Sequence, residues 1–294
     1  MLASTLRLGI ALLMLGGAAL GFWLGLWMAP TWTAMVLTAL AVPVATVLLA
    51  VLYSCTVARG DEPAAMWWRA LLGEWGAAIR IFLLRQPWAF SRPRIQPAMG
   101  QATRIPVLLV HGYVCNHRLW DPLIPALRAQ GHTTLAIDLE PVFTSIDDYV
   151  PLLERAVQAL CLQTGQDRVA LIGHSMGGLA IRAWMRRHGM AHAARAITLG
   201  TPHQGTQINP VIATPNALQM AWKSRWLQDL AASETDATRS LFRIALTPQD
   251  NIVFPQRVQT LPGVTPMVFE GRGHLQLCTD PDVRQWVCQE LALL

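Results

Sequence analysis

Charged residues are scarce in this chain, and one long stretch near its beginning has none. Asp, Glu, Lys and Arg make up 14% of the 294 residues, against about a quarter in typical soluble domains. All four types are missing between Leu8 and Ala58. Because a helix crosses a bilayer with about 20 apolar residues, this stretch can supply two spans. The composition disfavours an ordinary soluble chain and predicts a membrane anchor over residues 1–60.

A turn at Pro30 divides the anchor into two predicted transmembrane helices, over residues 8–28 and 33–53. Indole rings favour the membrane–water interface, and three of them surround this turn: Trp23, Trp27 and Trp32. The alternative is a cleaved secretory signal, whose apolar core has about 7–15 residues and ends at a small-residue cleavage site. Here the first apolar run is longer and a second follows at once, which favours a membrane hairpin.

The residues that flank the anchor bear on its orientation. Arg7 precedes the first span, Arg59 follows the second, and the turn is uncharged, so the positive-inside bias favours both ends in the cytoplasm. Five cysteines form an odd set, which suits a reducing compartment better than a disulfide framework. Cys278 and Cys288 could still pair on an oxidising side. We expect a multi-pass protein of a bacterial inner membrane, with the rest of the chain in the cytoplasm.

No basic cluster accompanies the net charge of +5. The arginines are scattered along the chain, whereas nucleic-acid binding requires a basic stripe or patch, so we expect no nucleic-acid partner. Mild basicity instead fits a protein that lies against anionic lipid, and the lipid bilayer is the partner that we expect.

Residues 61–103 form a separate segment after the anchor. Its first part interleaves tryptophan with arginine: Trp67, Trp68, Arg69, Trp75, Arg80, Arg85 and Trp88. This pattern predicts a helix in the headgroup region of a bilayer, with inserted rings and snorkelling guanidinium groups. The alternative is an ordinary helix packed on the domain that follows. Residues 91–100 contain turn-forming residues typical of a linker.

From residue 104 to residue 294, short β-rich runs alternate with helical patterns. The predicted strands cover residues 105–110, 133–138, 168–172, 196–199, 242–246 and 266–269, and the clearest helices cover residues 146–163, 179–188 and 282–293. Such alternation predicts an α/β domain with a mostly parallel sheet and helices on both of its faces.

A serine motif stands at the end of the third predicted strand. Ser175 is the centre of Gly-His-Ser-Met-Gly at residues 173–177, between an apolar run and a helical pattern. In this context the spacing is typical of a sharp turn that lifts a serine hydroxyl off the sheet, and only small residues fit two positions before and after it. We therefore predict Ser175 as a nucleophile.

A nucleophilic serine needs an imidazole base and an orienting carboxylate, and in this topology their chain order is serine, acid, histidine. His274 follows the last predicted strand and Asp250 follows the strand before it, so they are the predicted base and acid. We expect oxyanion donors at the backbone N–H groups of Met176, after the serine, and Tyr113, after the first strand. His111 is expected to hydrogen-bond within its own loop.

A long connection over residues 206–238 interrupts the alternation, and its apolar content predicts a lid over the site. Trp222 and Trp226 lie four residues apart on one helical face of this segment, so they either contact the substrate or fill the lid's own core. His203 directly follows a strand and is expected to line the pocket. These three residues are the candidates for substrate binding. Cys115 is either a reactive thiol or a buried small residue.

Together these features resemble the α/β-hydrolase superfamily, particularly bacterial lipases and their membrane-linked relatives. The pieces that carry the resemblance lie within residues 104–294: Val110-His111-Gly112-Tyr113, the glycine-flanked serine at 173–178, Thr201-Pro202-His203-Gln204-Gly205, Asp250-Asn251-Ile252-Val253 and Gly273-His274. The Thr-Pro-His-x-Gly piece is more particular to lipase-like members. The resemblance implies a triad of Ser175, Asp250 and His274.

The chain departs from secreted bacterial lipases in two respects. Its amino end has the pattern of a retained anchor, and no clear set of carboxylates matches the calcium site that such lipases often carry. Asp280 is the only suggestive position, and we expect it to cap the last helix with Pro281 in the first turn. We therefore expect no metal and no cofactor.

The leading hypothesis is a membrane-anchored serine hydrolase that cleaves carboxylic esters, with the acyl esters of lipids as substrates. The same triad would serve an acyltransferase, a thioesterase or an amidase, and the sequence leaves these alternatives open. A non-catalytic membrane scaffold is a further alternative, because a fold alone does not establish a function.

Overall fold

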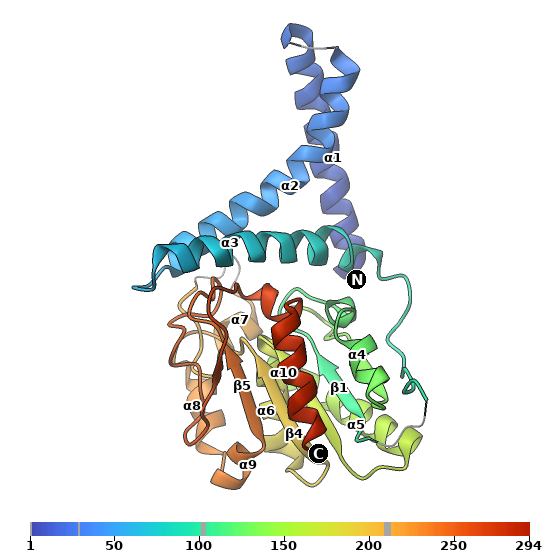
Figure 1. Cartoon of the computed structure of the whole chain (residues 1–294), viewed down its shortest axis with the longest axis vertical. Coiled ribbons are helices and arrows are strands. Elements are labelled where there is room, and N and C mark those ends of the chain that lie inside the picture. The colour runs from blue at the N-terminus through green and yellow to red at the C-terminus, as the bar shows by residue number, and fades with distance from the viewer. Residues whose placement is uncertain (1, 29, 101–103, 209–212) are drawn as a thin grey trace.

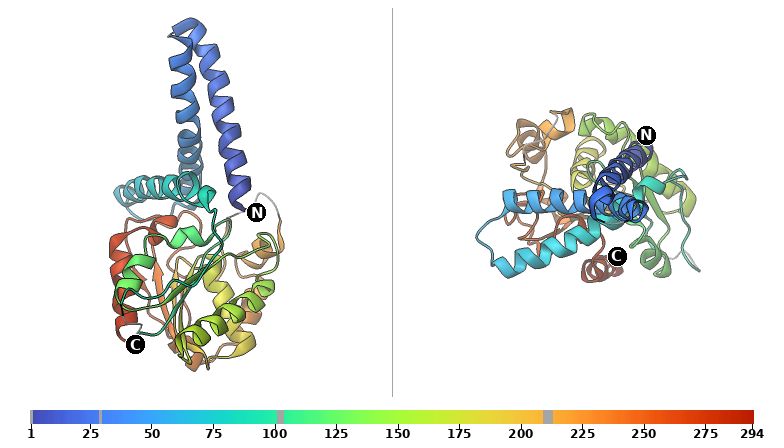
Figure 2. Two further views of the ribbon diagram at one scale, coloured as in Figure 1. Left: turned by 90° about the vertical axis from the view of Figure 1, so that its right-hand side faces the viewer. Right: turned by 90° about the horizontal axis from the view of Figure 1, so that it is seen from above.

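The computed structural model describes residues 2–28, 30–100, 104–208 and 213–294. A helical hairpin projects from an α/β domain, and a third helix crosses between the two (Figure 1). The hairpin consists of α1 (Leu2–Met28) and α2 (Thr31–Ala58), and the crossing helix is α3 (Ala64–Ala78), which a turn of π-helix (Ile79–Leu83) continues. Two further views show that the hairpin stands on one side of the domain (Figure 2).

Three glycines let α1 and α2 pack closely. Gly17, Gly21 and Gly25 are four residues apart, so they share one face of α1. A Cβ atom at Gly17 would lie 2.6 Å from the carbonyl oxygen of Thr38, and one at Gly21 would lie 2.4 Å from that of Ala34. At this short separation the Thr38 hydroxyl donates a hydrogen bond of 2.6 Å to the carbonyl of Gly17. Small residues at this spacing are typical of helix pairs in membranes.

Both hairpin helices are long and apolar enough to cross a membrane, over Leu2–Trp27 and Thr31–Ala58. These ranges overlap the predicted spans at residues 8–28 and 33–53. Only 17% and 11% of their most apolar windows are buried inside the structure. Most of these side chains therefore face outward, whereas a core helix of a soluble protein buries them.

The two halves of α2 have different surroundings. The first half runs beside α1, and the second half leans across the α/β domain (Figures 1 and 2). Pro43 lies inside the helix between them, where a proline removes a backbone donor and bends the axis. Val51, Cys55 and Ala58 of the second half are buried in one apolar cluster with residues of the α/β domain. The end of the second predicted span therefore packs against the α/β domain.

The α/β domain is built on one sheet of six parallel strands in the order β2-β1-β3-β4-β5-β6. The strands are β1 (Val107–Val110), β2 (Thr134–Ile137), β3 (Val169–His174), β4 (Ala193–Leu199), β5 (Phe242–Leu246) and β6 (Met267–Val268). All six predicted strands are present, although β4 begins at Ala193 instead of residue 196. The prediction of an α/β fold with a parallel sheet is confirmed.

Helices cover both faces of the sheet. They are α4 (Ile124–Ala129), α5 (Val150–Thr164), α6 (Met176–His188), α7 (Pro215–Gln219), α8 (Arg225–Ala232), α9 (Asp236–Ser240) and α10 (Pro281–Ala292), with short 3₁₀ segments at Gln86–Trp88, His117–Trp120, Ile146–Tyr149 and Leu275–Cys278. Successive residues of a strand point to opposite faces. Leu109 accordingly packs in one apolar cluster with Val287 of α10, and Leu108 packs in another with Leu179 of α6.

One face of α3 packs on the α/β domain and the other is exposed. Trp67 and Leu71 are buried in the apolar cluster that contains Phe269 of the domain. Trp68 and Leu72 are each 62% exposed. These contacts match the alternative interpretation of this segment, a helix packed on the domain, and they leave an apolar outer face.

Replacing Gly21 with leucine should separate α1 from α2, because the new side chain would meet the backbone of Ala34 and the hydroxyl of Thr38. Overpacking costs about 1–3 kcal/mol, so Gly21→Leu should lower the thermal midpoint of the detergent-solubilised protein. Gly16→Leu is the matched control, since a Cβ atom at Gly16 meets no described atom within 4 Å. Equal midpoints for the two variants would contradict the close packing.

Candidate active site

Ser175 lies in a sharp turn between β3 and α6. Its φ of 54° and ψ of −126° fall in a region that residues with a side chain rarely adopt. The surrounding backbone leaves no room for larger neighbours: a Cβ atom at Gly173 would lie 2.5 Å from the amide nitrogen of Gly178, and one at Gly177 would lie 2.2 Å from the carbonyl of Val110. The turn therefore holds the serine at the carboxyl end of β3.

Asp250 and His274 form a buried hydrogen-bonded pair. The Nδ1–H of His274 donates to Oδ2 of Asp250 at 2.8 Å, and each side chain is 4% exposed. The other carboxylate oxygen accepts from the backbone N–H groups of Ile252 and Val253, at 2.9 and 2.7 Å. Since an ionised carboxylate can only accept, Nδ1 carries the hydrogen and Nε2 is left as the basic nitrogen of the neutral ring.

The surroundings of His274 favour its protonated form. Burial by itself lowers the pKa of the imidazole, but the charge of Asp250, the hydrogen bond to it and the charge of Glu74 outweigh burial and raise the pKa of His274 above its ordinary value. His274 is thus suited to accept a proton from a neighbouring hydroxyl.

A second histidine supports His274 from the serine turn. The Nε2–H of His174 donates to the backbone carbonyl of His274 at 3.2 Å, and the two ring centroids lie 4.6 Å apart. Burial and the neighbouring His274 lower the pKa of His174 well below its ordinary value, so this ring is neutral and acts as a fixed donor. Sequence reasoning missed it, because the position directly before the serine is a variable one in the G-x-S-x-G motif.

The two predicted oxyanion donors flank Ser175. Met176 opens α6, and N–H groups in the first turn of a helix have no acceptor within that helix. The backbone at Gly112 passes so close to the serine that a Cβ atom there would lie 2.7 Å from Cβ of Ser175. The next residue, Tyr113, lines the same cavity as Ser175. Both donors thus lie on backbone that adjoins the nucleophile.

The contacts of His111 agree with the role expected for it. Its Nδ1–H donates to the carbonyl of Gly112 at 2.8 Å, and its Nε2 accepts from the N–H of Leu139 at 2.9 Å. Burial lowers the pKa of His111. The ring is therefore neutral and holds the first loop in place.

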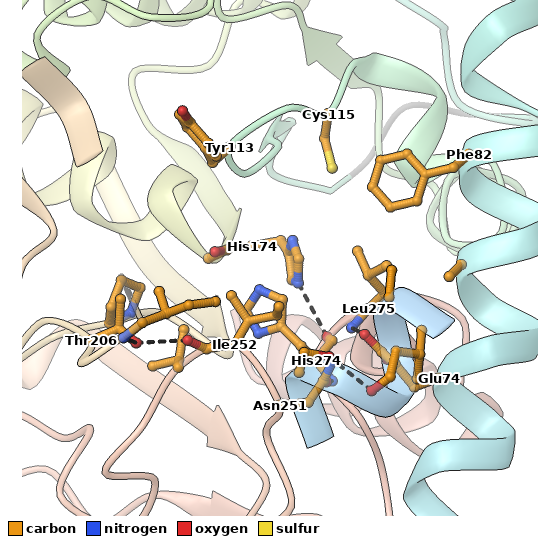
Figure 3. A pocket seen from close by; sticks show the side chains of 18 of the residues that line it. Glu74, Phe82, Tyr113, Cys115, His174, Thr206, Asn251, Ile252, His274 and Leu275 are labelled. Carbon is orange, nitrogen blue, oxygen red and sulfur yellow. Dashed lines mark hydrogen bonds between the residues drawn. The ribbon is translucent and has the colours of Figure 1, made fainter. Parts of the chain in front are cut away.

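Ser175, His174 and His274 line an apolar cavity of about 460 Å³ (Figure 3). The α/β domain contributes most of the other lining residues, and Figure 3 shows Tyr113, Cys115 and Ile252 among them. The remaining wall comes from outside the domain: Val47, Ala50, Val51 and Ser54 of α2, Glu74 and Ala78 of α3, and Phe82. The N-terminal helices therefore close the site.

The predicted lid over residues 206–238 forms part of the cavity wall, where Thr206 and Ile208 contribute from its start. Ala217 and Met220, in and directly after α7, line the cavity. Among the described residues, none after Met220 in the segment lines the cavity, and Leu227 of α8 packs on Leu179 and its neighbours in the domain core. Residues 209–212, Pro210 among them, lie outside the described residues. Much of the cover that we predicted for the lid is supplied by α2 and α3.

Within the described chain, none of the three candidate substrate-binding residues lines the cavity. His203 is buried, and its Nε2 is hydrogen-bonded to the hydroxyl of Thr198 at 3.0 Å. The Nε1–H of Trp226 donates to Asp147 at 2.8 Å, and its ring packs on the domain core. Trp222 lies beside the ammonium group of the following lysine. The contacts of His203 and Trp226 are structural.

Cys115 lines the cavity but is poorly suited to react. It is buried, and burial raises the pKa of its thiol to about 12, so the reactive thiolate is rare. All five cysteines are free, and Cys278 and Cys288 do not form a disulfide.

Asp280 caps α10, as expected. Its Oδ1 accepts from the backbone N–H groups of Asp282 and Val283 at 2.9 and 3.3 Å, and its Oδ2 accepts from Arg272 at 3.1 Å. Across the residues that the structure describes, no group of three or more His, Cys, Asp and Glu side chains could hold a metal ion.

Comparison with known proteins agrees with this architecture. A family model described as alpha/beta hydrolase fold matches residues 105–243, a range that begins directly before β1 and includes Ser175. The domain has the α/β-hydrolase fold. The match includes neither α1, α2 and α3 nor the residues after 243, among them Asp250 and His274.

Solved structures share the fold at low sequence identity. A mature lipase of Bacillus licheniformis is 16% identical, with a TM-score of 0.58 over 67% of this chain and 95% of that one. Lipase B of Aspergillus fumigatus is 14% identical, with a TM-score of 0.58 over 68% of this chain, but the match spans only 56% of its length. A thermophilic esterase of Thermogutta terrifontis is 17% identical, with a TM-score of 0.51 over 69% of this chain and 99% of that one.

The contact with Asp250 predicts how His274 titrates. In NMR spectra of isotope-labelled histidine, His274 should titrate above the ordinary imidazole pKa of about 6.5. Asp250→Asn should lower its pKa, because the variant removes the negative charge that stabilises the imidazolium. His174 and His203, whose pKa values burial lowers, provide internal references. An unchanged pKa of His274 in Asp250→Asn would contradict the assignment of this pair.

Proposed function

We propose that this protein is a membrane-anchored serine hydrolase that cleaves carboxylic esters, with the acyl esters of lipids as substrates. In this proposal Ser175 is the nucleophile, His274 the general base and Asp250 the acid that orients it. One observation carries the proposal: Ser175 and an Asp250-bound His274 line the same apolar cavity. The fold also occurs in proteins described as lipases and esterases.

The proposed reaction has two steps. Nε2 of His274 takes the proton of the Ser175 hydroxyl while Oγ attacks the ester carbonyl carbon, and the tetrahedral intermediate then expels the alcohol, which receives that proton. The resulting acyl-serine is attacked by water, which His274 deprotonates in turn, and the second tetrahedral intermediate expels Oγ of Ser175, which takes that proton as the carboxylic acid leaves. The N–H groups of Tyr113 and Met176 stabilise the negative oxygen of each intermediate, and one such donor contributes about 3–4 kcal/mol.

The course of α2 supports a lipid substrate. Leu37 and Leu40, before the bend at Pro43, are exposed apolar side chains, and Val47 and Val51, after it, line the cavity. An acyl chain that leaves a bilayer along this helix meets apolar side chains on the way to the cavity. Its transfer would expose little apolar surface to water, which keeps the transfer favourable.

The contacts of α1 support an anchor with both ends on one side of the membrane. A guanidinium N–H of Arg7 donates to the carbonyl of Pro87 at 2.8 Å, so the start of α1 lies against the 3₁₀ turn at Gln86–Trp88 that precedes the α/β domain. In the proposal α1 leads away from the domain through the bilayer and α2 returns to it. The positive-inside bias of Arg7 and Arg59 favours a domain on the cytoplasmic side of a bacterial inner membrane.

Ser175→Ala should abolish both the labelling of isolated membranes by a fluorophosphonate probe and the hydrolysis of nitrophenyl butyrate. Removing the nucleophile of a comparable triad slows turnover by about 10⁶-fold. Ser240→Ala is the control, because Ser240 is an exposed serine at the end of α9, and it should leave both signals unchanged. Labelling of Ser175→Ala at the wild-type level would assign the nucleophile to another residue.

Val47→Trp should fill part of the cavity and shift the substrate preference toward short acyl chains. A clash of about 1–3 kcal/mol corresponds to roughly 10-fold or more in kcat/KM for long-chain esters, with a smaller effect on butyrate. Leu49→Trp places the same side chain on the same helix at a position that is 66% exposed and should behave as wild type. Equal losses for all chain lengths in Val47→Trp would argue against acyl binding along α2.

A further inference from the structure

Glu74 is a carboxylate of α3 that is buried beside the loop of His274. Its side chain is 1% exposed and forms part of the cavity wall. Oε1 accepts from the backbone N–H of Leu275 at 3.0 Å, and Oε2 accepts from that of Gln276 at 3.0 Å. Figure 3 shows Glu74 reaching from its helix toward Leu275, next to His274. A residue outside the α/β domain thus holds the two peptide groups that follow the histidine.

The packing around this contact is tight. A Cβ atom at Gly273 would lie 2.5 Å from both Cβ and Oε2 of Glu74, so the residue before His274 rests directly on the glutamate. Burying a carboxylate is unfavourable unless its oxygens accept hydrogen bonds. The two N–H groups meet this requirement only while the loop over residues 273–276 keeps its observed position.

Further contacts tie the same loops to α2. The hydroxyl of Ser54 accepts from Nδ2 of Asn251 at 2.8 Å, and Oδ1 of Asn251 accepts from the backbone N–H of His274 at 3.1 Å. Nε2 of Gln256 donates both to the carbonyl of Ala58, at the end of α2, and to that of Asp250. The loops that carry the candidate acid and base are thus connected to the N-terminal helices.

We propose that Glu74 is a positioning residue for His274, and that α3 thereby completes the catalytic site. This inference rests on the proposed serine hydrolase function. Glu74 fixes the loop through its two backbone contacts, and its negative charge lies close enough to stabilise the imidazolium that forms when His274 accepts a proton. The chain therefore holds its base between Asp250 on the α/β domain and Glu74 on the N-terminal segment.

Glu74 has a raised pKa, so its charge changes with pH near neutrality. Burial raises the pKa of Glu74 to about 7, although the charge of His274 and the two backbone hydrogen bonds act in the opposite direction. The other titratable groups that face it are Asp250, whose charge also raises the pKa of Glu74, and the thiols of Cys55, Cys115 and Cys278. Removing this carboxylate should lower the pKa of His274, since a nearby negative charge favours the protonated ring.

Glu74→Gln tests the proposal in the full chain, purified in detergent micelles, with nitrophenyl butyrate as substrate. The variant is nearly isosteric but uncharged, and its amide group can accept only one of the two N–H bonds. The free energy of a hydrogen bond to a charged group corresponds to a change in rate of about 10-fold or more. We therefore expect kcat to fall by about 10-fold, while KM changes less. The acidic limb of kcat/KM should move to lower pH, because the base then stays unprotonated at lower pH.

Two variants accompany Glu74→Gln. Glu74→Asp keeps the charge but is one methylene shorter, so kcat should fall while the acidic limb stays close to that of the wild type. If Glu74→Gln does not fold, a wild-type kcat in Glu74→Asp overturns the proposal. Glu62→Gln is the matched control: Glu62 accepts from Arg257 of the α/β domain at 2.6 Å, so it removes a carboxylate contact between the same two parts of the chain without touching the His274 loop.

The outcomes separate this inference from the function on which it rests. A wild-type kcat and an unmoved acidic limb in Glu74→Gln would overturn the positioning role. The positioning role would also be overturned if kcat fell equally in Glu74→Gln and Glu62→Gln and the acidic limb did not shift in either. Glu74 would then serve only to dock α3 on the α/β domain. If the wild-type chain neither turns over ester nor reacts with fluorophosphonate, the proposed function fails. The pKa of His274, measured by NMR in wild type and Glu74→Gln, then decides the inference without turnover.

Discussion

Two carboxylates are buried beside one imidazole, and the arrangement of the site depends on how their oxygens are satisfied. Asp250 accepts three hydrogen bonds and Glu74 accepts two. The donors all belong to loops that follow β5 and β6, so keeping two charges in an apolar interior also keeps these loops in place. The orientation of His274 follows from that requirement, because its ring and its backbone are both part of the same network.

The N-terminal helices are therefore more than an attachment. α3 supplies Glu74, and α2 supplies a wall of the cavity and an acceptor for Asn251. The family match covers residues 105–243, so these contributions lie outside the matched part, as do Asp250 and His274. Helices that precede the α/β domain in the chain thus complete the wall of the site.

The sequence predicts the six strands well, because each is a short apolar run between turn residues, and β1, β2 and β3 are buried on both faces. The serine turn is also local, since its glycines and its flanking strand and helix are neighbours in the chain. Glu74 could not be found in this way, because its burial depends on α3 docking onto a loop 200 residues later. Trp222 and Trp226 are candidates for substrate contact in the sequence but do not line the cavity, since helical spacing shows which face is apolar but not what packs on it.

The position of the bend at Pro43 fixes which side chains of α2 face the cavity, a constraint that a simple membrane anchor does not have. A simple anchor tolerates changes of length and sequence as long as it stays apolar. In α2 each added or removed residue would rotate everything beyond it by about 100° about the helix axis, and Val47, Val51 and Ser54 would turn away from the cavity together. An unrelated apolar helix of equal length in place of α2 could keep the hydropathy of the segment and yet leave the cavity open along one side. The number of residues between Pro43 and the cavity-lining part of α2 is thus a requirement of the site, although no residue in that interval takes part in the proposed chemistry.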